Sequence, residues 1–308
     1  MFIGSHSHLF SAIKITDGEE LWTTELPDRI ESSATSDPSG NHVFVGCYDG
    51  NLYCLDAFTG RISWQYQTED AIKSSPLCTG SYVLFGSHDR SLYALSVTDG
   101  QLHWRKPISS GSLFASPSWN GDDRILCASL DGTCSSLSVS TGELLWSTKL
   151  SKPVFASPAW CCDRDRCLFA SVEGFMRCCS AKTGEVFWDF QAGGPIFSTP
   201  VAANCCILFG SHDNFLYCLD ERTGVERWRA QFLTPVYSTP FVTSFIACSN
   251  TSGNLRLLDF SNGRLLAETQ LDGEVFSSPV VTGQYVVIGC RDDYVYCFQL
   301  ANQQTKLK

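Results

Sequence analysis

Long apolar runs are absent from this sequence of 308 residues. No stretch of eighteen apolar residues occurs, and the chain does not open on a charged segment followed by an apolar one. A transmembrane helix needs about 20 apolar residues, and a secretory signal has that order of segments. Helical periodicity is equally scarce. The sequence therefore predicts a non-helical cytoplasmic protein that neither crosses a membrane nor is secreted.

Positive charge is also sparse. The chain has 22 lysines and arginines against 32 aspartates and glutamates, a net charge of −10, and the basic residues form no run or stripe. Nucleic-acid-binding proteins neutralise phosphates with clustered lysines and arginines, so no nucleic acid partner is expected. Paired motifs such as Cys-x-x-Cys or His-x-x-x-His are missing too, and no metal site is predicted.

What the sequence does contain is a repeat. A glycine followed four residues later by a tryptophan closes six units, at Gly18/Trp22, Gly60/Trp64, Gly100/Trp104, Gly142/Trp146, Gly184/Trp188 and Gly224/Trp228. A seventh copy, at Gly263, has Ala267 in place of the tryptophan. A turn of small residues ending in proline opens the units, at Pro76, Pro117, Pro158, Pro200, Pro240 and Pro279. These prolines lie 41, 41, 42, 40 and 39 residues apart, and a period of about 40 to 45 residues is typical of a four-stranded propeller blade.

Each period has the pattern of two β-hairpins. Short runs of β-branched and aromatic residues are separated by glycine turns, such as Asp49-Gly50 between the second and third strands and Thr59-Gly60 between the third and fourth. One four-stranded sheet cannot bury both of its faces, whereas radially arranged sheets bury them against one another. The predicted fold class is all-β, a β-propeller with four antiparallel strands in each blade.

The number of blades follows from the number of strands. The second-strand signature occurs eight times, but the complete four-strand unit occurs only six times. Residues 1–26 supply second to fourth strands without a first, and residues 274–300 supply first to third strands without a fourth. We therefore expect eight blades with incomplete first and last blades, and seven blades as the alternative. Met1 would then be a cut point inside a longer chain, because a natural start would not expose a blade edge.

The unbroken period predicts a single domain. This propeller covers residues 1–300, is expected to be monomeric, and is followed by a polar tail over residues 301–308.

Tryptophan and cysteine are both expected to be structural. An indole at the end of an outer strand can cover the border with the next blade and donate its N–H to a carbonyl there, and we predict this role for Trp22, Trp64, Trp104, Trp146, Trp188 and Trp228. Most of the sixteen cysteines occupy strand positions where sister repeats have small residues, as Cys54 and Cys218 align with Ala94. Buried, reduced thiols are therefore expected, which fits the cytoplasm.

The repeat resembles a known family. The segments from Cys54 to Trp64 and from Cys218 to Trp228 are similar to the tryptophan-docking repeat of pyrroloquinoline-quinone (PQQ) propellers, Ala-x-Asp-x-x-Thr-Gly-x-x-x-Trp. More narrowly, the phrases IGSHSH (3–8), EDAIKSSP (69–76) and IGCRDDYVYC (288–297) resemble the C-terminal propeller of the animal β-alanine-activating enzymes, also described as acyl-CoA synthetase or aminoadipate-semialdehyde-dehydrogenase-like proteins.

That resemblance implies a ligase whose catalytic parts lie elsewhere. In the family, an upstream adenylating domain activates an amino acid with ATP, and a carrier domain takes it as a phosphopantetheine thioester. This chain has neither a glycine-rich phosphate loop nor a carrier-type Asp-Ser-Leu serine. The chain itself is therefore not expected to be an enzyme.

The likeness to quinoproteins raises a different possibility. Alcohol-oxidising quinoproteins can hold PQQ against a vicinal disulfide beside a Ca²⁺ site, and this chain has vicinal pairs at Cys161-Cys162, Cys178-Cys179 and Cys205-Cys206. A set of Glu, Asn and Asp ligands for Ca²⁺ cannot be assembled from the repeats. Neighbouring side chains of a strand also point to opposite faces, as expected for Cys205-Cys206. Neither PQQ nor another cofactor is expected.

His6, His88 and His212 occupy equivalent turn positions in separate repeats and form a candidate rim site. Because different blades present them, they are expected to be too far apart to share a metal. We expect each imidazole to hydrogen-bond within its own hairpin, and the acidic residues beside them, such as Asp89, to cap their turns.

The residue ahead of each opening turn is the candidate binding feature. In chain order these residues are Glu31, Lys73, Phe114, Phe155, Phe197, Tyr237 and Phe276. In a propeller this segment leads into the innermost strand, so five aromatics and two opposite charges could line an axial pocket. The alternative is that each ring packs between blades as core.

These observations favour a non-catalytic binding or scaffolding propeller. It would present a rim or an axial pocket to a protein or acyl-acceptor partner, such as upstream adenylation and carrier domains. The alternative, from a different class, is a PQQ-dependent dehydrogenase.

Overall fold

The computed structural model describes residues 1–300; the predicted tail, residues 301–308, lies outside the described residues. Within that described range the chain forms thirty β-strands in eight antiparallel sheets and no helix. Accordingly, no helix in this part of the chain is long and apolar enough to cross a membrane. The all-β prediction is confirmed.

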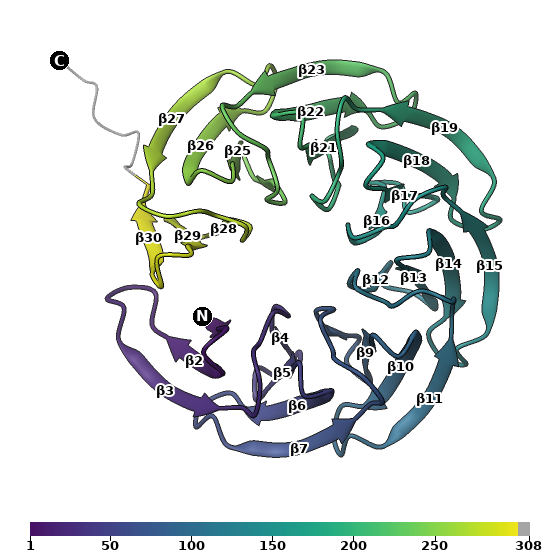
Figure 1. Ribbon diagram of the computed structural model, residues 1–308, viewed down its shortest axis with the longest axis vertical. Coiled ribbons are helices and arrows are strands. Elements are labelled where there is room, and N and C mark those ends of the chain that lie inside the picture. Colours follow the sequence, from purple (N-terminus) through teal and green to yellow (C-terminus); the bar gives the residue numbers. More distant parts are fainter. Residues whose placement is uncertain (301–308) are drawn as a thin grey trace. The chain divides into compact units, whose positions relative to one another are not determined.

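Six of the sheets have four strands, ordered in space as they are in the chain (Figure 1). The first three are β4 (Thr35–Ser36), β5 (His42–Gly46), β6 (Asn51–Asp56), β7 (Ile62–Gln67); β8 (Leu77–Cys78), β9 (Tyr82–Gly86), β10 (Ser91–Ser96), β11 (Leu102–Pro107); and β12 (Ser118–Trp119), β13 (Arg124–Ala128), β14 (Thr133–Ser138), β15 (Leu144–Lys149). The next three are β16 (Ala159–Trp160), β17 (Arg166–Ala170), β18 (Phe175–Ser180), β19 (Val186–Gln191); β20 (Val201–Ala203), β21 (Cys206–Gly210), β22 (Phe215–Asp220), β23 (Glu226–Gln231); and β24 (Phe241–Val242), β25 (Phe245–Ser249), β26 (Asn254–Asp259), β27 (Leu265–Gln270).

The other two sheets have three strands each within residues 1–300. One holds β1 (Phe2–Gly4), β2 (Leu9–Ile13) and β3 (Glu20–Glu25), and the other holds β28 (Val280–Thr282), β29 (Tyr285–Gly289) and β30 (Val295–Gln299). The expectation of eight blades with incomplete first and last blades is therefore confirmed, and the seven-blade alternative is wrong.

Two compact units divide the chain. Unit 1 comprises Met1–Val172 and Arg177–Phe187, and unit 2 comprises Glu173–Met176 and the chain from Trp188 onward. In unit 1 the fourth strands β3, β7, β11 and β15 lie on the outer side, and the short first strands β4 and β12 lie on the inner side. In unit 2, β23 and β27 are outer strands and β28 is an inner one (Figure 1).

Burial explains the sequence pattern of each strand type. The second strand β5 and the third strand β6 are almost wholly buried, because both of their faces meet neighbouring sheets. The fourth strand β7 alternates between exposed and half-buried residues, as an outer strand with one solvated face does. Near-continuous apolar runs and alternating runs therefore succeed one another within each repeat.

The core lies between neighbouring sheets. In unit 1, Phe44 and Cys54 of one sheet pack with Phe85 and Tyr93 of the next, and all four are almost fully buried. Unit 2 repeats the arrangement between the sheets β20–β23 and β24–β27, where Leu208 and Cys218 belong to one cluster. Cysteines in the strands thus act as small core residues, as the repeat alignment predicts.

Candidate functional site

Where the opening turn begins with a serine, as at Ser32 and Ser74, that serine holds the turn. The Ser32 hydroxyl donates to the carbonyl of Gly46 at 2.9 Å and accepts its N–H at 2.8 Å. Ser74 makes the same two bonds with Gly86, at 2.7 and 2.8 Å. The turn is thereby attached to the end of the second strand of its own sheet, which determines where the preceding residue lies.

The second residue of the opening turn joins neighbouring sheets. In unit 1 the N–H of Ser33 donates to the hydroxyl of Ser75, Ser75 to Ser116, and Ser116 to Ser157, at 2.9, 2.8 and 3.0 Å. In unit 2, Thr199 donates to Thr239 at 3.1 Å, and Thr239 to Ser278 at 2.9 Å. Sequence reasoning missed this relay, although the recurring serine or threonine at this position was its signal.

The turn between the second and third strands lies beside the segment that leads into the opening turn. The N–H of His88 donates to the carbonyl of Ala71, and the N–H of His212 donates to that of Pro195, both at 2.9 Å. Arg291 donates to Glu274 in the same way at 2.9 Å. The backbone therefore places the candidate rim residues next to the candidate pocket residues.

In unit 2 these two sets of side chains form one aromatic cluster. The rings of Phe197 and His212 have centroids 4.6 Å apart, Phe197 and Tyr237 stack at 5.3 Å, and Tyr237 meets Phe276 edge-on at 5.5 Å. The Arg291 guanidinium lies 4.6 Å above the centre of the Phe276 ring. Phe276 is 40% exposed and the other three rings are half-buried. The cluster, which we call the unit 2 aromatic surface, therefore reaches solvent.

In unit 1 the equivalent positions are charged at one end. Glu31 lies 3.7 Å from His6, 3.5 Å from Arg29 and 3.6 Å from Lys73. The ammonium group of Lys73 is also 4.6 Å from the centre of the Tyr48 ring. Three basic side chains thus surround one carboxylate.

Aromatic contacts continue from that charged end. Lys73 lies 5.3 Å from the centre of the Phe114 ring, and Phe114 packs edge-on against Phe155 at 5.1 Å. His88 is 6.4 Å from Phe114. The structure thus brings together His6, Glu31, Lys73, His88, Phe114 and Phe155 in unit 1, and Phe197, His212, Tyr237 and Phe276 in unit 2.

Two of the histidines differ from the expectation. Among residues 1–300, the Nε2 atoms of His88 and His212 are buried and have no hydrogen-bond partner, so the predicted bond within the hairpin is wrong for these atoms. Burial lowers the pKa of both imidazoles, and the charge of Lys73 lowers that of His88 further. The local reason is that these turns direct the imidazole toward aromatic rings.

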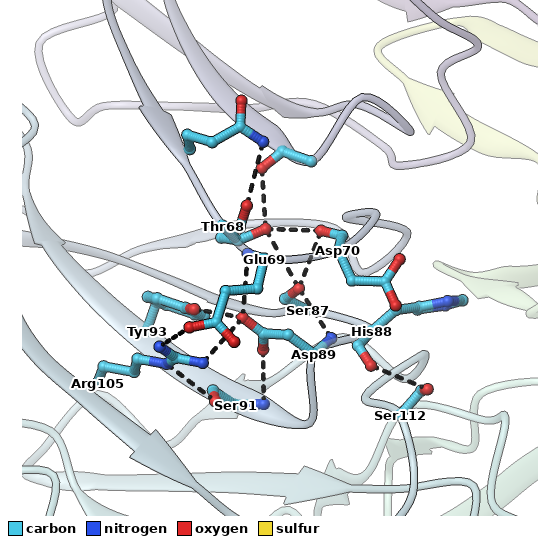
Figure 2. A network of polar contacts seen from close by, with 12 residues as sticks. Thr68, Glu69, Asp70, Ser87, His88, Asp89, Ser91, Tyr93, Arg105 and Ser112 are labelled. Atoms are coloured by element: carbon cyan, nitrogen blue, oxygen red, sulfur yellow. Dashed lines mark hydrogen bonds and ion pairs between the residues drawn. The ribbon is translucent and has the colours of Figure 1, made fainter.

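The acidic residues of these turns are engaged within their own sheets. Asp89 accepts the N–H of Ser91 at 2.9 Å and the hydroxyl of Tyr93, and its Oδ2 lies 3.4 Å from Arg105 (Figure 2). Glu69 pairs with the same guanidinium at 2.5 Å. The tyrosine, three residues into the following strand, is a partner that sequence reasoning missed.

The same Asp–Tyr pair recurs. Tyr53 donates to Asp49 at 2.5 Å, Tyr217 to Asp213 at 2.6 Å, and the Tyr296 hydroxyl to Asp292 at 2.5 Å. The hydrogen bond to Asp292 raises the pKa of Tyr296 to about 12. These carboxylates serve the turns rather than an open acidic rim.

Each of five indoles donates its N–H to a carbonyl of the next sheet. The bonds run from Trp22 to Ala57, Trp64 to Val97, Trp104 to Val139, Trp146 to Ala181 and Trp188 to Glu221, at 3.0, 3.2, 2.9, 2.8 and 3.2 Å. The ring of Trp228 packs on Gly263. These residues lie at the borders between neighbouring sheets.

Cys178 and Cys179 are both buried, whereas the other two vicinal pairs each have one buried and one exposed cysteine. Cys161 and Cys206 are buried whereas Cys162 and Cys205 are exposed, and Cys206 accepts a hydrogen bond from Arg227 at 3.0 Å. Within residues 1–300 no group of three His, Cys, Asp or Glu side chains is placed to hold a metal ion.

The fold defines the class of this protein as an eight-bladed β-propeller. Its solved structural relatives include BamB from Moraxella catarrhalis, with a TM-score of 0.84 at 18% identity over 97% of this chain and 93% of that one. They also include the computationally designed Ika8 protein, with a TM-score of 0.87 at 17% identity over 97% and 92%. At such identities the likeness shows the fold alone.

A narrower relationship comes from sequence. The family model described as "Beta-alanine-activating enzyme, beta-propeller" matches residues 1–300. The chain belongs to this family of propellers. It is 44% identical to the human β-alanine-activating enzyme over 61 residues and 47% identical to the zebrafish (Danio rerio) enzyme over 57 residues. The aligned segments are 20% and 18% of this chain but only 6% and 5% of those proteins.

Proposed function

We propose that this chain is a non-catalytic binding and scaffolding domain for an ATP-dependent, β-alanine-activating enzyme of the cytoplasm. Its partner is the phosphopantetheine carrier domain, which has to move between an adenylating site and an acyl acceptor. Family membership supports the enzyme class, and function on this widely used fold has to be argued from the surface. Sixteen thiols, most of them buried, fit a reducing compartment.

The observation that carries this proposal is the unit 2 aromatic surface. Phe197, Tyr237 and Phe276 contact one another yet remain partly open to solvent, and Arg291 lies over the outermost ring. Aromatic and arginine side chains are the residues that most often dominate binding energy at interfaces. A core role for these rings would leave them fully buried, as Phe85 and Phe209 are.

Binding to a purified phosphopantetheinylated carrier domain from a β-alanine-activating enzyme tests the proposal. We expect saturable binding that Phe197→Ala and Tyr237→Ala each weaken about tenfold, which is about 1.4 kcal/mol. Phe58→Ala is the matched control. Phe58 is 74% exposed and lies in the turn between the third and fourth strands, β6 and β7, not in an opening turn. This variant should bind like the parent chain.

The melting temperature separates binding from folding. For the two surface variants it should fall by only a few degrees, about 2 to 4 °C for each kcal/mol in domains of this size. Extensive unfolding would instead show that the rings are core. We also propose that the chain works without a quinone, and dye-linked alcohol oxidation on addition of PQQ and Ca²⁺ would contradict this.

A further inference from the structure

A surface cavity of about 370 Å³ lies in unit 1, at the border between the sheets β12–β15 and β16–β19. Three segments supply one basic residue each to its lining: Arg124 begins β13, Arg164 lies in the turn before β17, and Lys182 lies in the turn after β18. Small-molecule sites have volumes of about 300 to 1,000 Å³, so this cavity is large enough for a small ligand.

None of these three basic groups is paired with a carboxylate among residues 1–300. The Arg124 guanidinium donates to the carbonyl of Ala181 at 3.2 Å, and the Arg164 guanidinium donates to the carbonyl of Asn120. Most of the five N–H donors of each guanidinium therefore remain available to a ligand.

Two carboxylates, those of Asp122 and Asp165, also belong to the lining but make no ion pair within the described chain. Three basic and two acidic side chains leave a net formal charge of +1 on the lining, whereas the whole chain carries −10. The cavity is therefore a locally basic site on an acidic protein, and its charge favours an anion.

The next sheet shows how the repeat neutralises an arginine at the start of the second strand. Arg166 begins β17 as Arg124 begins β13, and the Arg166 guanidinium pairs with Asp163 at 2.7 Å. Asp123, the acid directly before Arg124, is instead held by the hydroxyl of Ser138 at 2.8 Å. The charge of Arg124 thus lacks the partner that its counterpart has.

Arg164 adopts a backbone conformation for which the repeat otherwise uses glycine. Its φ is +58°, and four other sheets have a left-handed glycine in the same turn, between the first and second strands: Gly40, Gly80, Gly121 and Gly283. A side chain is sterically unfavourable there, and strained residues of this kind cluster at functional sites. An added Cβ on Gly121 would lie 2.7 Å from Nη1 of Arg164, so this glycine leaves room for the guanidinium.

We propose that this cavity binds the phosphate group of a small phosphorylated molecule. A phosphate monoester at pH 7 carries a charge of about −1.5 to −2 and three acceptor oxygens, which match three basic side chains better than a carboxylate does. Arg124 and Arg164 bind the oxygens through their N–H forks, and Lys182 adds a point charge. Asp122 and Asp165 accept hydroxyl donors of the same molecule. The site shares no residue with the unit 2 aromatic surface and does not depend on it.

Titration calorimetry of the intact chain at low ionic strength tests the site, with inorganic phosphate as the first probe. We expect saturable binding that weakens as salt screens the charges, and at least about tenfold weaker binding of acetate. Glycerol phosphate should bind more tightly than inorganic phosphate, because its hydroxyls reach the carboxylates of the lining. Amide chemical shifts of residues 120–124, 164–165 and 181–182 should move along the same saturation curve.

Arg164→Gly is the most direct variant, because it installs the residue that the repeat uses in this turn. It should weaken phosphate binding at least about tenfold, while the melting temperature stays the same or rises because glycine relieves the strained backbone. Lys182→Ala should also weaken binding. Arg222→Ala is the matched control, since Arg222 is exposed in the equivalent turn after β22 in unit 2. This control should bind phosphate like the parent chain.

Unchanged affinity of Arg164→Gly would overturn the proposal, as would shifts confined to amides outside the cavity. Acetate that binds as tightly as phosphate would reveal a general affinity for anions, and an equal loss in Arg222→Ala would reveal an effect of overall charge. Either result would also overturn it. Equal affinities for phosphate and glycerol phosphate would contradict the larger ligand, because the cavity would then hold free phosphate only.

Discussion

His212 combines burial with an unmet hydrogen-bonding group. Its Nε2 atom has no partner among residues 1–300, and its ring lies beside the stacked pair of Phe197 at 4.6 Å and Tyr237 at 5.9 Å. Burial favours the neutral imidazole and so lowers its pKa. The residue that sequence reasoning placed on an open rim is thus part of the aromatic surface, and protonating it in place is unfavourable.

Replacing this imidazole should therefore change how stability depends on pH. Above about pH 6.5 His212 is neutral in both the folded and unfolded states and contributes nothing. Below that pH the unfolded chain takes up the proton first, so the free energy of unfolding falls by up to about 1.4 kcal/mol per pH unit until the lowered folded pKa is reached. His212→Phe keeps an aromatic ring at this position and removes the contribution of His212 to the pH dependence of the free energy of unfolding.

Urea unfolding of both chains between pH 5 and 7.5 measures the difference. The two curves should run parallel above pH 6.5 and diverge below it, with His88 leaving some dependence in the variant. Hydrogen bonds lower the pKa of carboxylates such as Asp131, so these groups change the free energy of unfolding only at a more acidic pH. Parallel curves over the whole range would show that burial does not disfavour the His212 cation.

At the scale of the elements, the turn between the third and fourth strands is also a contact between sheets. The turn glycine has a positive φ, +65° at Gly142, and the ring of Trp104 covers it so closely that an added Cβ would lie 2.6 Å from the ring. The same indole donates to the carbonyl of Val139 in that sheet. Glycine and tryptophan recur together because, in each of the six four-stranded sheets, the turn glycine receives the indole of the sheet before it.

Two glycine variants separate the cost of left-handed backbone from the cost of displacing the indole. Gly18→Ala and Gly142→Ala both force a side chain into left-handed backbone, at a cost of about 1 to 2 kcal/mol each. Only Gly142→Ala also displaces an indole, which should add about 1 to 3 kcal/mol. Chemical denaturation should show the larger loss of stability for Gly142→Ala, and equal losses would mean that the indole moves aside without cost.

The sequence predicts those features of the structure that depend on residues within one repeat. The alternation of turns and apolar runs determines strands, hairpins and the two incomplete sheets, because each depends on residues close together in sequence. The bond from Ser33 to Ser75 and the indole over Gly142 could not be predicted as contacts, since they join repeats about 40 residues apart. The repeat identified the aromatic positions ahead of the opening turns. Whether these rings line a surface or pack as core could not be predicted, because it depends on how neighbouring sheets pack.

For the molecule as a whole, cysteine is the most unusual feature. Eleven of the sixteen thiols are buried, two are half-buried, and Cys162, Cys205 and Cys297 are exposed. Burial raises the pKa of Cys54, Cys127 and Cys248 to about 12. A thiol of that pKa is almost wholly protonated at pH 8, and only the thiolate reacts, so both access and chemistry protect the interior.

Thiol titration with a disulfide reagent should therefore resolve classes of cysteine. At pH 8 in native buffer about three thiols should react quickly, and all sixteen should react in denaturant without any reductant. Cys205→Ser should remove one fast thiol, whereas its neighbouring control Cys206→Ser should leave the fast class unchanged, because Cys206 is 3% exposed. Fewer than sixteen thiols in denaturant, restored by reductant, would instead reveal a disulfide. If peptide mapping placed that disulfide at a vicinal pair, the quinoprotein alternative would regain support, because a vicinal disulfide is the feature that such enzymes place against their cofactor.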